Sequence, residues 1–259
     1  MLRDSLEDKA LRGLLSLLLG LPRAVGFLTI IPIPKAIWRF SVPTDFVLVW
    51  FPVVGLFIGL AVYGTMAVFD HSSLGPVVGL ALWALITGGL HLDGLGDVLD
   101  GLARRGTPKE RKEVLKDPHI GSVGAAGLTV FLLLKYGALS AAPWGVMVAP
   151  VVGRSATVIS MCLFPYGRPG ERTLGASLWP TRRALVASLS LAVMALSLWP
   201  FGGATGALGL LASVFLTFLG GLSLAAFLSR AFGGLTGDCC GAICEASEAL
   251  LLLSLYLLR

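Results

Sequence analysis

The fold of this chain is decided by the stretch GPVVGLALWALITGGLHLDGLGDVLDG, residues 75–101. Its first part, up to residue 92, is a long apolar run without charge, and Asp93, Asp97 and Asp100 follow at intervals of four and three residues. If the run continues as a helix, these intervals place the three carboxylates on one face. Carboxylates cost several kcal/mol at membrane depth, so three on one face require a compensating cation or a water-filled site. The stretch therefore predicts a membrane helix that leads into a chemical site.

The composition of the whole chain is that of a membrane protein. Of 259 residues, 56% are hydrophobic and 14% are charged, which is too apolar for a soluble domain of this size. The net charge of +5 would raise the question of nucleic acid in a soluble protein, but the positions of Lys and Arg explain it better here. We predict an all-α, polytopic helical bundle in the lipid bilayer, a single domain over residues 1–259 with no nucleic-acid partner.

Seven apolar runs are long enough to cross a bilayer, for which about 20 residues span a core of ~30 Å. The N-terminal block Leu14–Leu21 is shorter and is interrupted by Gly20 and Pro22, so we expect an interfacial helix there. The seven predicted spans are residues 45–69, 75–92, 121–142, 144–164, 184–201, 204–228 and 241–258.

Basic residues gather at one end of these predicted helices. They lie in the N-terminal segment and in the connections 93–120, 165–183 and 229–240, whereas the connections at the other end have none. By the positive-inside rule, the N-terminus and these connections lie on the cytoplasmic side of the cell (inner) membrane. The polar motifs in the three connections should therefore build one cavity on the cytoplasmic side.

The three aspartates favour a hard cation. They offer only oxygen ligands, without Cys or clustered His, so Mg²⁺ or else Mn²⁺ is the preferred metal. Mg²⁺ usually takes one or two carboxylates and shares its other positions with water and substrate phosphates, which predicts a phosphate-bearing substrate. Gly94 and Gly101 would let a bulky headgroup approach the backbone. The alternative, solvated loop acids, is disfavoured by the apolar residues between Asp93, Asp97 and Asp100.

Two basic residues lie inside predicted spans, where a charge needs a partner. Arg154 has a planar fork that suits a phosphate or a carboxylate, so we select it as a functional candidate. Lys135 either snorkels to the interface or balances a buried acid. His91, which begins the aspartate motif, could touch the metal or a phosphate, although a histidine at a helix end is more often structural.

Further candidates lie in the connections between spans. Lys116 and Asp117 directly precede the third span, near enough to the cavity mouth to contact a substrate. Tyr166 and Arg168 belong to a basic, aromatic loop that suits a diphosphate substrate with a flat base. Positive-inside charge alone would also explain Arg168.

The segment Gly233–Asp238 precedes the last predicted span. Glycines before a helix N-terminus leave backbone N–H groups for an anion, and Thr236 lies among them as a candidate for substrate binding. Asp238 and Glu245 are seven residues apart on one helix face and could complete the metal site or hold an attacking hydroxyl. N-capping by Thr236 or Asp238 is the alternative, but it leaves Glu245 inside an apolar helix unexplained.

Six motifs occur in order along the chain. They are Phe-Leu-Thr-x-Ile-Pro-x-Pro (27–34), Phe-Pro-x-x-Gly (51–55), His-x-Asp-Gly-x-x-Asp-x-x-Asp-Gly (91–101), Lys-Asp-x-x-Ile-Gly (116–121), Pro-Tyr-x-Arg (165–168) and Gly-x-Thr-Gly-Asp-x-x-Gly-Ala (234–242). In this order the chain resembles, over nearly its whole length, the cobalamin synthase family, the adenosylcobinamide-GDP ribazoletransferases. It departs from the family pattern at Ile30, where Arg is usual, and at Pro118-His119, where Ser-Arg is usual.

The resemblance implies a Mg²⁺-dependent transferase that joins adenosylcobinamide-GDP to α-ribazole or its 5′-phosphate and releases GMP. The product is adenosylcobalamin or its phosphate, at the end of nucleotide-loop assembly in vitamin B12 biosynthesis. On this basis we expect Asp93 and Asp97 to hold Mg²⁺ on the diphosphate and Asp100 to act as the general base. The residues expected to stabilise phosphate charge are Lys116, Arg154 and Arg168. The chain could form a homo-oligomer, which the sequence leaves open.

Two other functions are compatible with parts of the pattern. A CDP-alcohol-type membrane phosphotransferase also spaces aspartates after an Asp-Gly pair, but the Ala-Arg that should follow that pair and the long gap before the later aspartates are missing here. An ion-coupled transporter could use intramembrane carboxylates and Arg154 along a cation path. The lack of inverted repeats and the charge gathered at one face disfavour transport.

Overall fold

The computed structural model describes residues 2–69, 73–170, 174–201 and 206–258. In these ranges the chain is helical and contains no β-strand, which confirms the predicted all-α class. The helices are α1 (Leu2–Leu28), α2 (Lys35–Trp38), α3 (Thr44–Leu48), α4 (Phe51–Val68), α5 (Leu74–Ile86), α6 (Leu90–Ala103), α7 (Pro108–Val114), α8 (Ser122–Ala141), α9 (Ala149–Leu163), α10 (Leu174–Ser177), α11 (Arg183–Leu198), α12 (Ala207–Phe232) and α13 (Gly237–Leu257), with 3-10 turns at Pro143–Met147 and Trp199–Phe201.

The membrane bundle is confirmed, whereas the predicted count of seven spans is not. Within the described ranges, five segments are long and apolar enough to cross a bilayer, or six if α5 and α6 form one broken span. The five are Thr44–Val68, Ser122–Ala141, Arg183–Phe201, Ala207–Phe232 and Gly237–Leu257. The predicted fourth span is represented by α9, which has only 15 residues. Because residues 149–162 of α9 are all buried, this helix lies enclosed by other helices.

The apolar run at residue 75 ends before the aspartates. It forms α5, which stops at Ile86, and α6 begins at Leu90 after a bend of 88°. Gly88 and Gly89 lie in the bend with φ of 60° and 69°, a left-handed conformation that suits glycine. The expectation of one continuous helix is therefore wrong, although α6 carries all three aspartates as a helix of its own.

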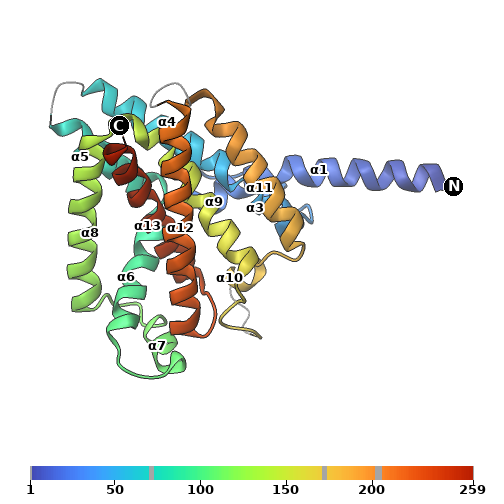
Figure 1. Ribbon diagram of the computed structural model, residues 1–259. Coiled ribbons are helices and arrows are strands. Elements are labelled where there is room, and N and C mark those ends of the chain that lie inside the picture. The colour runs from blue at the N-terminus through green and yellow to red at the C-terminus, as the bar shows by residue number, and fades with distance from the viewer. Residues whose placement is uncertain (1, 70–72, 171–173, 202–205, 259) are drawn as a thin grey trace.

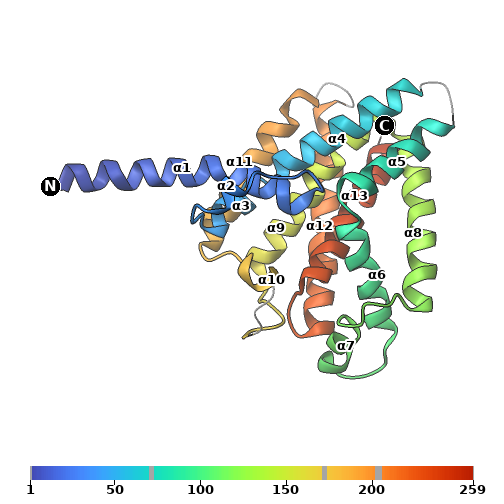
Figure 2. The ribbon, with the colours of Figure 1, turned by 180° about the vertical axis from the view of Figure 1, so that it is seen from behind.

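The N-terminal helix differs from the interrupted block that the sequence suggested. α1 is a 27-residue helix that runs through Gly20 and Pro22 without a break. Its C-terminal part packs against α3 and α4, and its N-terminal part projects away from the bundle (Figures 1 and 2). A side chain at Gly20 would collide with the carbonyl oxygen of Phe46 in α3, so glycine allows this packing. The interfacial position of α1 stays a prediction.

Helices α6 and α13 pack backbone against backbone. A Cβ atom at Gly94 would lie 2.9 Å from the carbonyl oxygen of Asp238, and one at Gly241 would lie 3.0 Å from that of His91. Gly101 similarly faces the ring of Phe232, at 2.9 Å. Our interpretation that Gly94 and Gly101 admit a headgroup is therefore wrong, because protein atoms fill that space. The close approach instead brings the start of α13 to the aspartates of α6.

Candidate active site

An acidic cluster forms where α6 meets the start of α13; we use this name for Asp93, Asp97 and Asp238. Asp97 is partly buried and lies within electrostatic reach of the other two carboxylates and of Asp100. Arg168 approaches from the loop after α9, with its Nη2 atom 3.6 Å from Oδ2 of Asp238. This single guanidinium leaves an excess of negative charge among the described residues, and like charges held together favour binding of a cation.

Backbone pairing holds Arg168 at this place. The N–H of Gly167 donates to the carbonyl oxygen of Leu235 at 2.7 Å, and the N–H of Leu235 donates to that of Pro165 at 2.9 Å. Gly234, with φ of 116°, packs directly against Gly167, where a side chain would not fit. The predicted convergence of the segments after spans two, four and six is thus seen in the structure.

The guanidinium of Arg168 is well placed for an anionic ligand. Its side chain is 14% exposed, and its buried Nε and Nη2 atoms make no hydrogen bond to the part of the chain that the structure describes. Buried donors usually have partners, so the two nitrogens indicate a ligand beside the acidic cluster. Arginine offers a planar fork of donors that matches phosphate oxygens.

Asp100 lies on α6 with the other aspartates but binds the start of α8. Its Oδ2 accepts the N–H of Gly121 at 2.7 Å, and its Oδ1 accepts the N–H of Gly124 at 2.8 Å. A Cβ atom at Gly121 would lie 2.5 Å from Oδ1, so this contact depends on glycine. A carboxylate at a helix N-terminus satisfies free N–H groups and complements the helix dipole. Sequence analysis missed this role, for which Gly121 and Gly124 were the available signal.

A pocket on the underside of the bundle contains Asp97 and Asp100 together with Arg104, Asp117 and His119. The Oδ1 atom of Asp117 accepts hydrogen bonds from the backbone N–H of His119 at 3.0 Å and from its Nδ1 at 2.8 Å. These bonds hold the pKa of Asp117 below its ordinary value. Asp117 therefore lies beside the aspartates of α6, as predicted, and is charged at neutral pH.

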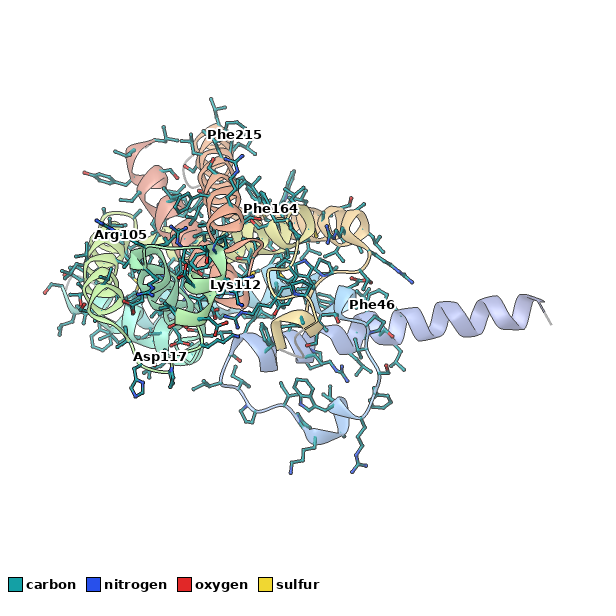
Figure 3. The ribbon with its side chains drawn as sticks, turned by 90° about the horizontal axis from the view of Figure 1, so that it is seen from below. Phe46, Arg105, Lys112, Asp117, Phe164 and Phe215 are labelled. Carbon is teal, nitrogen blue, oxygen red and sulfur yellow. The ribbon has the colours of Figure 1, made fainter. Side chains whose placement is uncertain are left out.

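The lower face also carries the end of α7. Lys116 is exposed at this face, and its Nζ lies 3.1 Å from Oε1 of Glu113. Lys112 crosses beneath the bundle and donates from Nζ to the carbonyl oxygen of Gly167 at 2.6 Å. Seen from below, Lys112 lies nearer the middle of the bundle than Asp117 does (Figure 3). α7 thus ties the underside pocket to the loop that carries Arg168.

A second pocket, the inner pocket, lies on the other side of the acidic cluster. Asp93 and Asp238 belong to its wall, and so does the buried His91. The apolar part of the wall comes from α1, α4, α9 and the segment after α10, with the side chains of Phe27, Phe51, Met161, Leu178 and Trp179. The acidic cluster therefore lies between an apolar pocket and a polar one.

Two other predicted substrate contacts lie close to this pocket. The ring of Tyr166 packs against that of Trp179 with 5.0 Å between centroids. Thr236 is only 1% exposed, and its hydroxyl accepts the N–H of Cys239 at 3.3 Å at the start of α13. Thr236 thus has the N-capping role weighed as the alternative, and it positions Asp238 two residues on.

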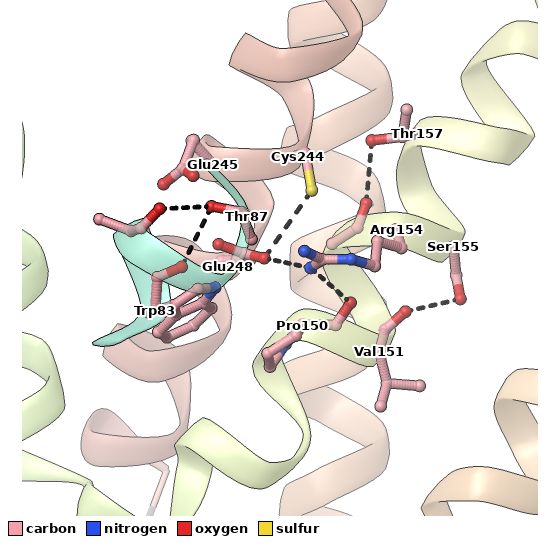
Figure 4. A network of polar contacts seen from close by, with 12 residues as sticks. Trp83, Thr87, Pro150, Val151, Arg154, Ser155, Thr157, Cys244, Glu245 and Glu248 are labelled. Carbon is pink, nitrogen blue, oxygen red and sulfur yellow. Dashed lines mark hydrogen bonds and ion pairs between the residues drawn. The ribbon is translucent and has the colours of Figure 1, made fainter. Parts of the chain in front are cut away.

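Four buried charged side chains form a separate group, the buried ion network of Lys135, Arg154, Glu245 and Glu248. Figure 4 shows Arg154 of this network beside Glu248, with Glu245 nearby. The Nζ of Lys135 lies 2.6 Å from Oε2 of Glu245 and 2.7 Å from Oε2 of Glu248. Nη1 of Arg154 donates to Oε1 of Glu248 at 2.7 Å. Lys135 also lies 3.9 Å from the ring centroid of Trp83.

The network explains three residues that sequence analysis placed differently or undervalued. Arg154 pairs with a carboxylate, one of its two expected partners, and not with the acidic cluster. Glu245 lies on α13 with Asp238 but binds Lys135, which balances buried acids. Glu248 accepts hydrogen bonds from both cations, and an acidic residue inside an apolar helix was its only signal.

The donor set of the acidic cluster can be compared with the needs of Mg²⁺. Within the described ranges, no three side chains of His, Cys, Asp or Glu are arranged to hold a metal ion by themselves. Mg²⁺ does not need such a cage, because it commonly uses one or two carboxylates and takes its other ligands from water and substrate phosphates. Asp93 and Asp97, in excess over the nearby positive charge, fit an ion of this kind that is shared with a phosphate substrate.

Comparisons with known proteins identify the family of this chain. Residues 20–256 match the family model described as cobalamin-5-phosphate synthase. The chain is similar to three proteins named adenosylcobinamide-GDP ribazoletransferase. The one from Stutzerimonas stutzeri is 38% identical over 90% of this chain and 96% of the relative. The one from Roseiflexus sp. is 35% identical over 98% of this chain and 95% of the relative, and the one from Brevibacillus brevis is 33% identical over 90% of this chain and 95% of the relative. No solved structure matches it. The chain therefore belongs to the cobalamin-5-phosphate synthase family.

Proposed function

We propose that this protein transfers the cobinamide phosphate of adenosylcobinamide-GDP to α-ribazole or to α-ribazole 5′-phosphate and releases GMP. The relatives that carry this activity in their names cover most of the chain. The observation that carries the proposal is the acidic cluster beside Arg168, because this pairing suits a metal-bound diphosphate. Family membership leaves no observation in favour of a CDP-alcohol phosphotransferase or a transporter.

The reaction is a substitution at phosphorus. A ribose hydroxyl of the acceptor attacks the phosphorus on the cobinamide side, a P–O bond to the ribose forms, and the P–O bond to GMP breaks. Asp238 lies in the wall of the same pocket as Asp93 and is placed to take the hydroxyl proton. Arg168, beside Asp238, is placed to bind the phosphate oxygens as their charge develops.

Asp93 and Asp97 are the proposed ligands of Mg²⁺. When bound, Mg²⁺ would neutralise charge on the diphosphate and make its phosphorus easier to attack. Two carboxylates on successive turns of α6 leave most of the coordination shell to water and phosphate oxygens. Asp93 and Asp97 would thus hold the substrate diphosphate through the shared Mg²⁺ ion.

We revise three roles that were expected from the sequence and from the resemblance. Asp100 uses both carboxylate oxygens to bind the start of α8, so we assign it a positioning role instead of that of the base. Arg154 and Glu245 are omitted from the reaction because they pair within the buried ion network. Lys116 directly precedes Asp117, which lines the underside pocket, and is retained as a candidate contact for the GDP moiety.

We also place the active site at the cytoplasmic face of the cell membrane. α7 and the loop of Arg168, which carry much of the basic charge, lie on the same side of the bundle as the acidic cluster. Positively charged loops are retained on the cytoplasmic side during insertion. Nucleotide substrates would then reach the site directly from the cytoplasm.

The activity can be tested with the purified protein in liposomes. Adenosylcobinamide-GDP, α-ribazole or its 5′-phosphate, and Mg²⁺ are supplied, and GMP and the cobalamin product are measured together. We expect the two products in equal amounts and only when both substrates are present. Absence of product, under conditions in which one of the named relatives is active, would overturn the proposal.

A further inference from the structure

The inner pocket lies beside the acidic cluster, and the phosphate chemistry does not use the apolar part of its wall. It has a volume of about 200 Å³ and an apolar wall of Phe27, Phe51, Met161 and Trp179. We propose that this pocket binds the aromatic base of the ribazole acceptor and thereby selects which base the enzyme attaches. The inference rests on the proposed function, and names the place of one of its two substrates.

The size of the pocket distinguishes between the two substrates. An apolar cavity of about 150 Å³ is enough to take up a benzene ring. The base of α-ribazole is a benzimidazole, and a pocket somewhat larger than this suits its fused pair of rings. The corrin ring system, with its central metal and amide side chains, is several times too large. The cobinamide part therefore stays outside the pocket, where its diphosphate can reach Arg168.

The chemistry of the wall also distinguishes between the two bases. Guanine carries hydrogen-bonding groups around its edge, and these are costly to bury without partners. A benzimidazole base has mostly carbon at its edge and gains from burial against Phe27, Phe51 and Met161. The apolar wall therefore fits the acceptor base better than the guanine of the donor.

The polar part of the pocket wall indicates where the ribose of the acceptor lies. Asp93 and Asp238 lie at the side of the pocket that joins the acidic cluster. With its base in the pocket, the acceptor presents its ribose to these carboxylates, and the hydroxyl lies where Asp238 can take its proton. The base pocket and the phosphate site are thus on opposite sides of the reacting atoms.

Trp179, which lines the pocket, also carries a hydrogen-bond donor without a partner among the described residues. Its indole Nε1 is buried and has no hydrogen-bond partner among the residues that the structure describes. The ring is supported from behind by Tyr166, with an angle of 51° between the ring planes. A ring nitrogen of the base can accept this N–H, which would favour a nitrogen heterocycle over a plain hydrocarbon ring.

The decisive test is a substitution that fills the pocket with a larger side chain. Met161, which is 5% exposed, lines the pocket from α9. In Met161→Trp we expect the KM for α-ribazole to rise on the order of ten-fold or more, because a pocket discriminates strongly against excess volume. The KM for adenosylcobinamide-GDP should remain within about two-fold, the usual effect of a change away from a binding site. An analogue whose base is a single imidazole ring should lose less than α-ribazole does.

A matched control adds the same bulk elsewhere. Leu219→Trp places a tryptophan on the exposed face of α12, where Leu219 is 57% exposed, and should leave both KM values unchanged. If Met161→Trp does not fold, Met161→Ala opens the pocket instead. That variant should accept a base with a larger ring substituent more readily than the wild type does.

Binding without turnover separates this inference from the proposed function. Equilibrium dialysis of α-ribazole alone should show binding to the wild type and to Leu219→Trp and loss of binding to Met161→Trp. If the wild type makes GMP but Met161→Trp raises both KM values equally, the pocket does not hold the base. If the variant changes only the dependence of activity on lipid acyl chains, the pocket holds lipid and the inference is overturned.

Discussion

Two groups of charged side chains lie along α13, and they differ in how their charge is balanced. The buried ion network contains two cations and two carboxylates, none of them more than 4% exposed, and each carboxylate lies within 2.7 Å of a cation. The acidic cluster contains three partly accessible carboxylates, with Arg168 at 3.6 Å from one of them. The formal charges of the first group cancel within the network, although Nε and Nη2 of Arg154 have no hydrogen-bond partner among the described residues. The charges of the second group do not cancel, which is the property expected of a binding site.

The comparison shows why charge alone did not identify the site. Arg154 and Glu245 look functional in the sequence because a charge inside an apolar span needs an explanation. The structure supplies that explanation within the protein itself. Removing one partner of a buried pair leaves an uncompensated charge, whereas removing one carboxylate from a crowded cluster relieves repulsion. The two regions should therefore respond to substitution in opposite ways.

The largest expected effect is on the stability of the buried ion network. Glu248→Gln leaves Lys135 and Arg154 with only one carboxylate, so the free energy of unfolding should fall by about 3–5 kcal/mol. Thermal unfolding of the purified protein in detergent measures this loss. The control is the double variant Lys135→Met/Glu245→Gln, which keeps the Arg154–Glu248 pair and should lose less. A stable Glu248→Gln protein without activity would place the network in the reaction.

The next effect concerns activity and not folding. Asp97→Asn removes a proposed metal ligand, and kcat/KM should fall about 10²- to 10³-fold. Its unfolding temperature should stay the same or rise, because Asp93 and Asp238 lose a like-charged neighbour. GMP release and thermal unfolding are measured on the same preparation. Glu110→Gln makes the same chemical change at an exposed residue of α7 and should leave turnover unchanged.

Chelation tests the same site without a substitution. Removal of Mg²⁺ with EDTA should stop turnover by the wild type, and added Mg²⁺ should restore it. The unfolding temperature should hardly change, since the substrate completes the ion's coordination. Full turnover after chelation would remove the metal from the proposal.

A smaller effect is expected at Asp100, which connects α6 to the start of α8. Asp100→Ala removes the acceptor for the N–H groups of Gly121 and Gly124, and should cost about 1–2 kcal/mol, as other N-caps do. Hydrogen exchange at the start of α8 should become faster. Asp100→Asn retains one acceptor oxygen and should keep much of the activity. If it is stable but inactive, Asp100 is the general base after all.

The smallest effect is expected at the start of α7, where Thr107 and Glu110 form a capping box, each accepting a hydrogen bond from the backbone of the other. The carboxylate of Glu110 is exposed to water. Hydrogen bonds from Thr107 lower the pKa of Glu110. The box should therefore be intact above the ordinary pKa of a glutamate and be lost as the pH falls through the lowered value. Thr107→Ala removes the hydroxyl donor but keeps the backbone N–H donor, so it should weaken this pH dependence without abolishing it, which NMR of α7 can follow. A change in whole-protein stability of the size expected for Glu248→Gln would contradict this ranking.

The sequence predicted the membrane class, most span positions and the aspartate motif, because these depend on local composition and spacing. It also predicted that the segments of Asp93, Arg168 and Asp238 meet at one end of the helix bundle, because the connections at that end contain the basic residues. It could not predict that Lys135 pairs with residues 110 and 113 positions later. It also did not reveal the bend at Gly88-Gly89, although two adjacent glycines are a signal for a turn. Such features depend on tertiary packing.

The backbone contact of α6 with α13 has a consequence for how the protein is made. Asp238, Glu245 and Glu248 all belong to α13, which leaves the ribosome after the helices they bind. Until then Lys135 and Arg154 have no carboxylate partners from α13, and Asp93 lacks the other half of its site. The nascent chain is therefore inactive and unstable in the bilayer until α13 inserts. Insertion of this one helix would complete folding and activity together, so that an incompletely synthesised chain offers no working intermediate.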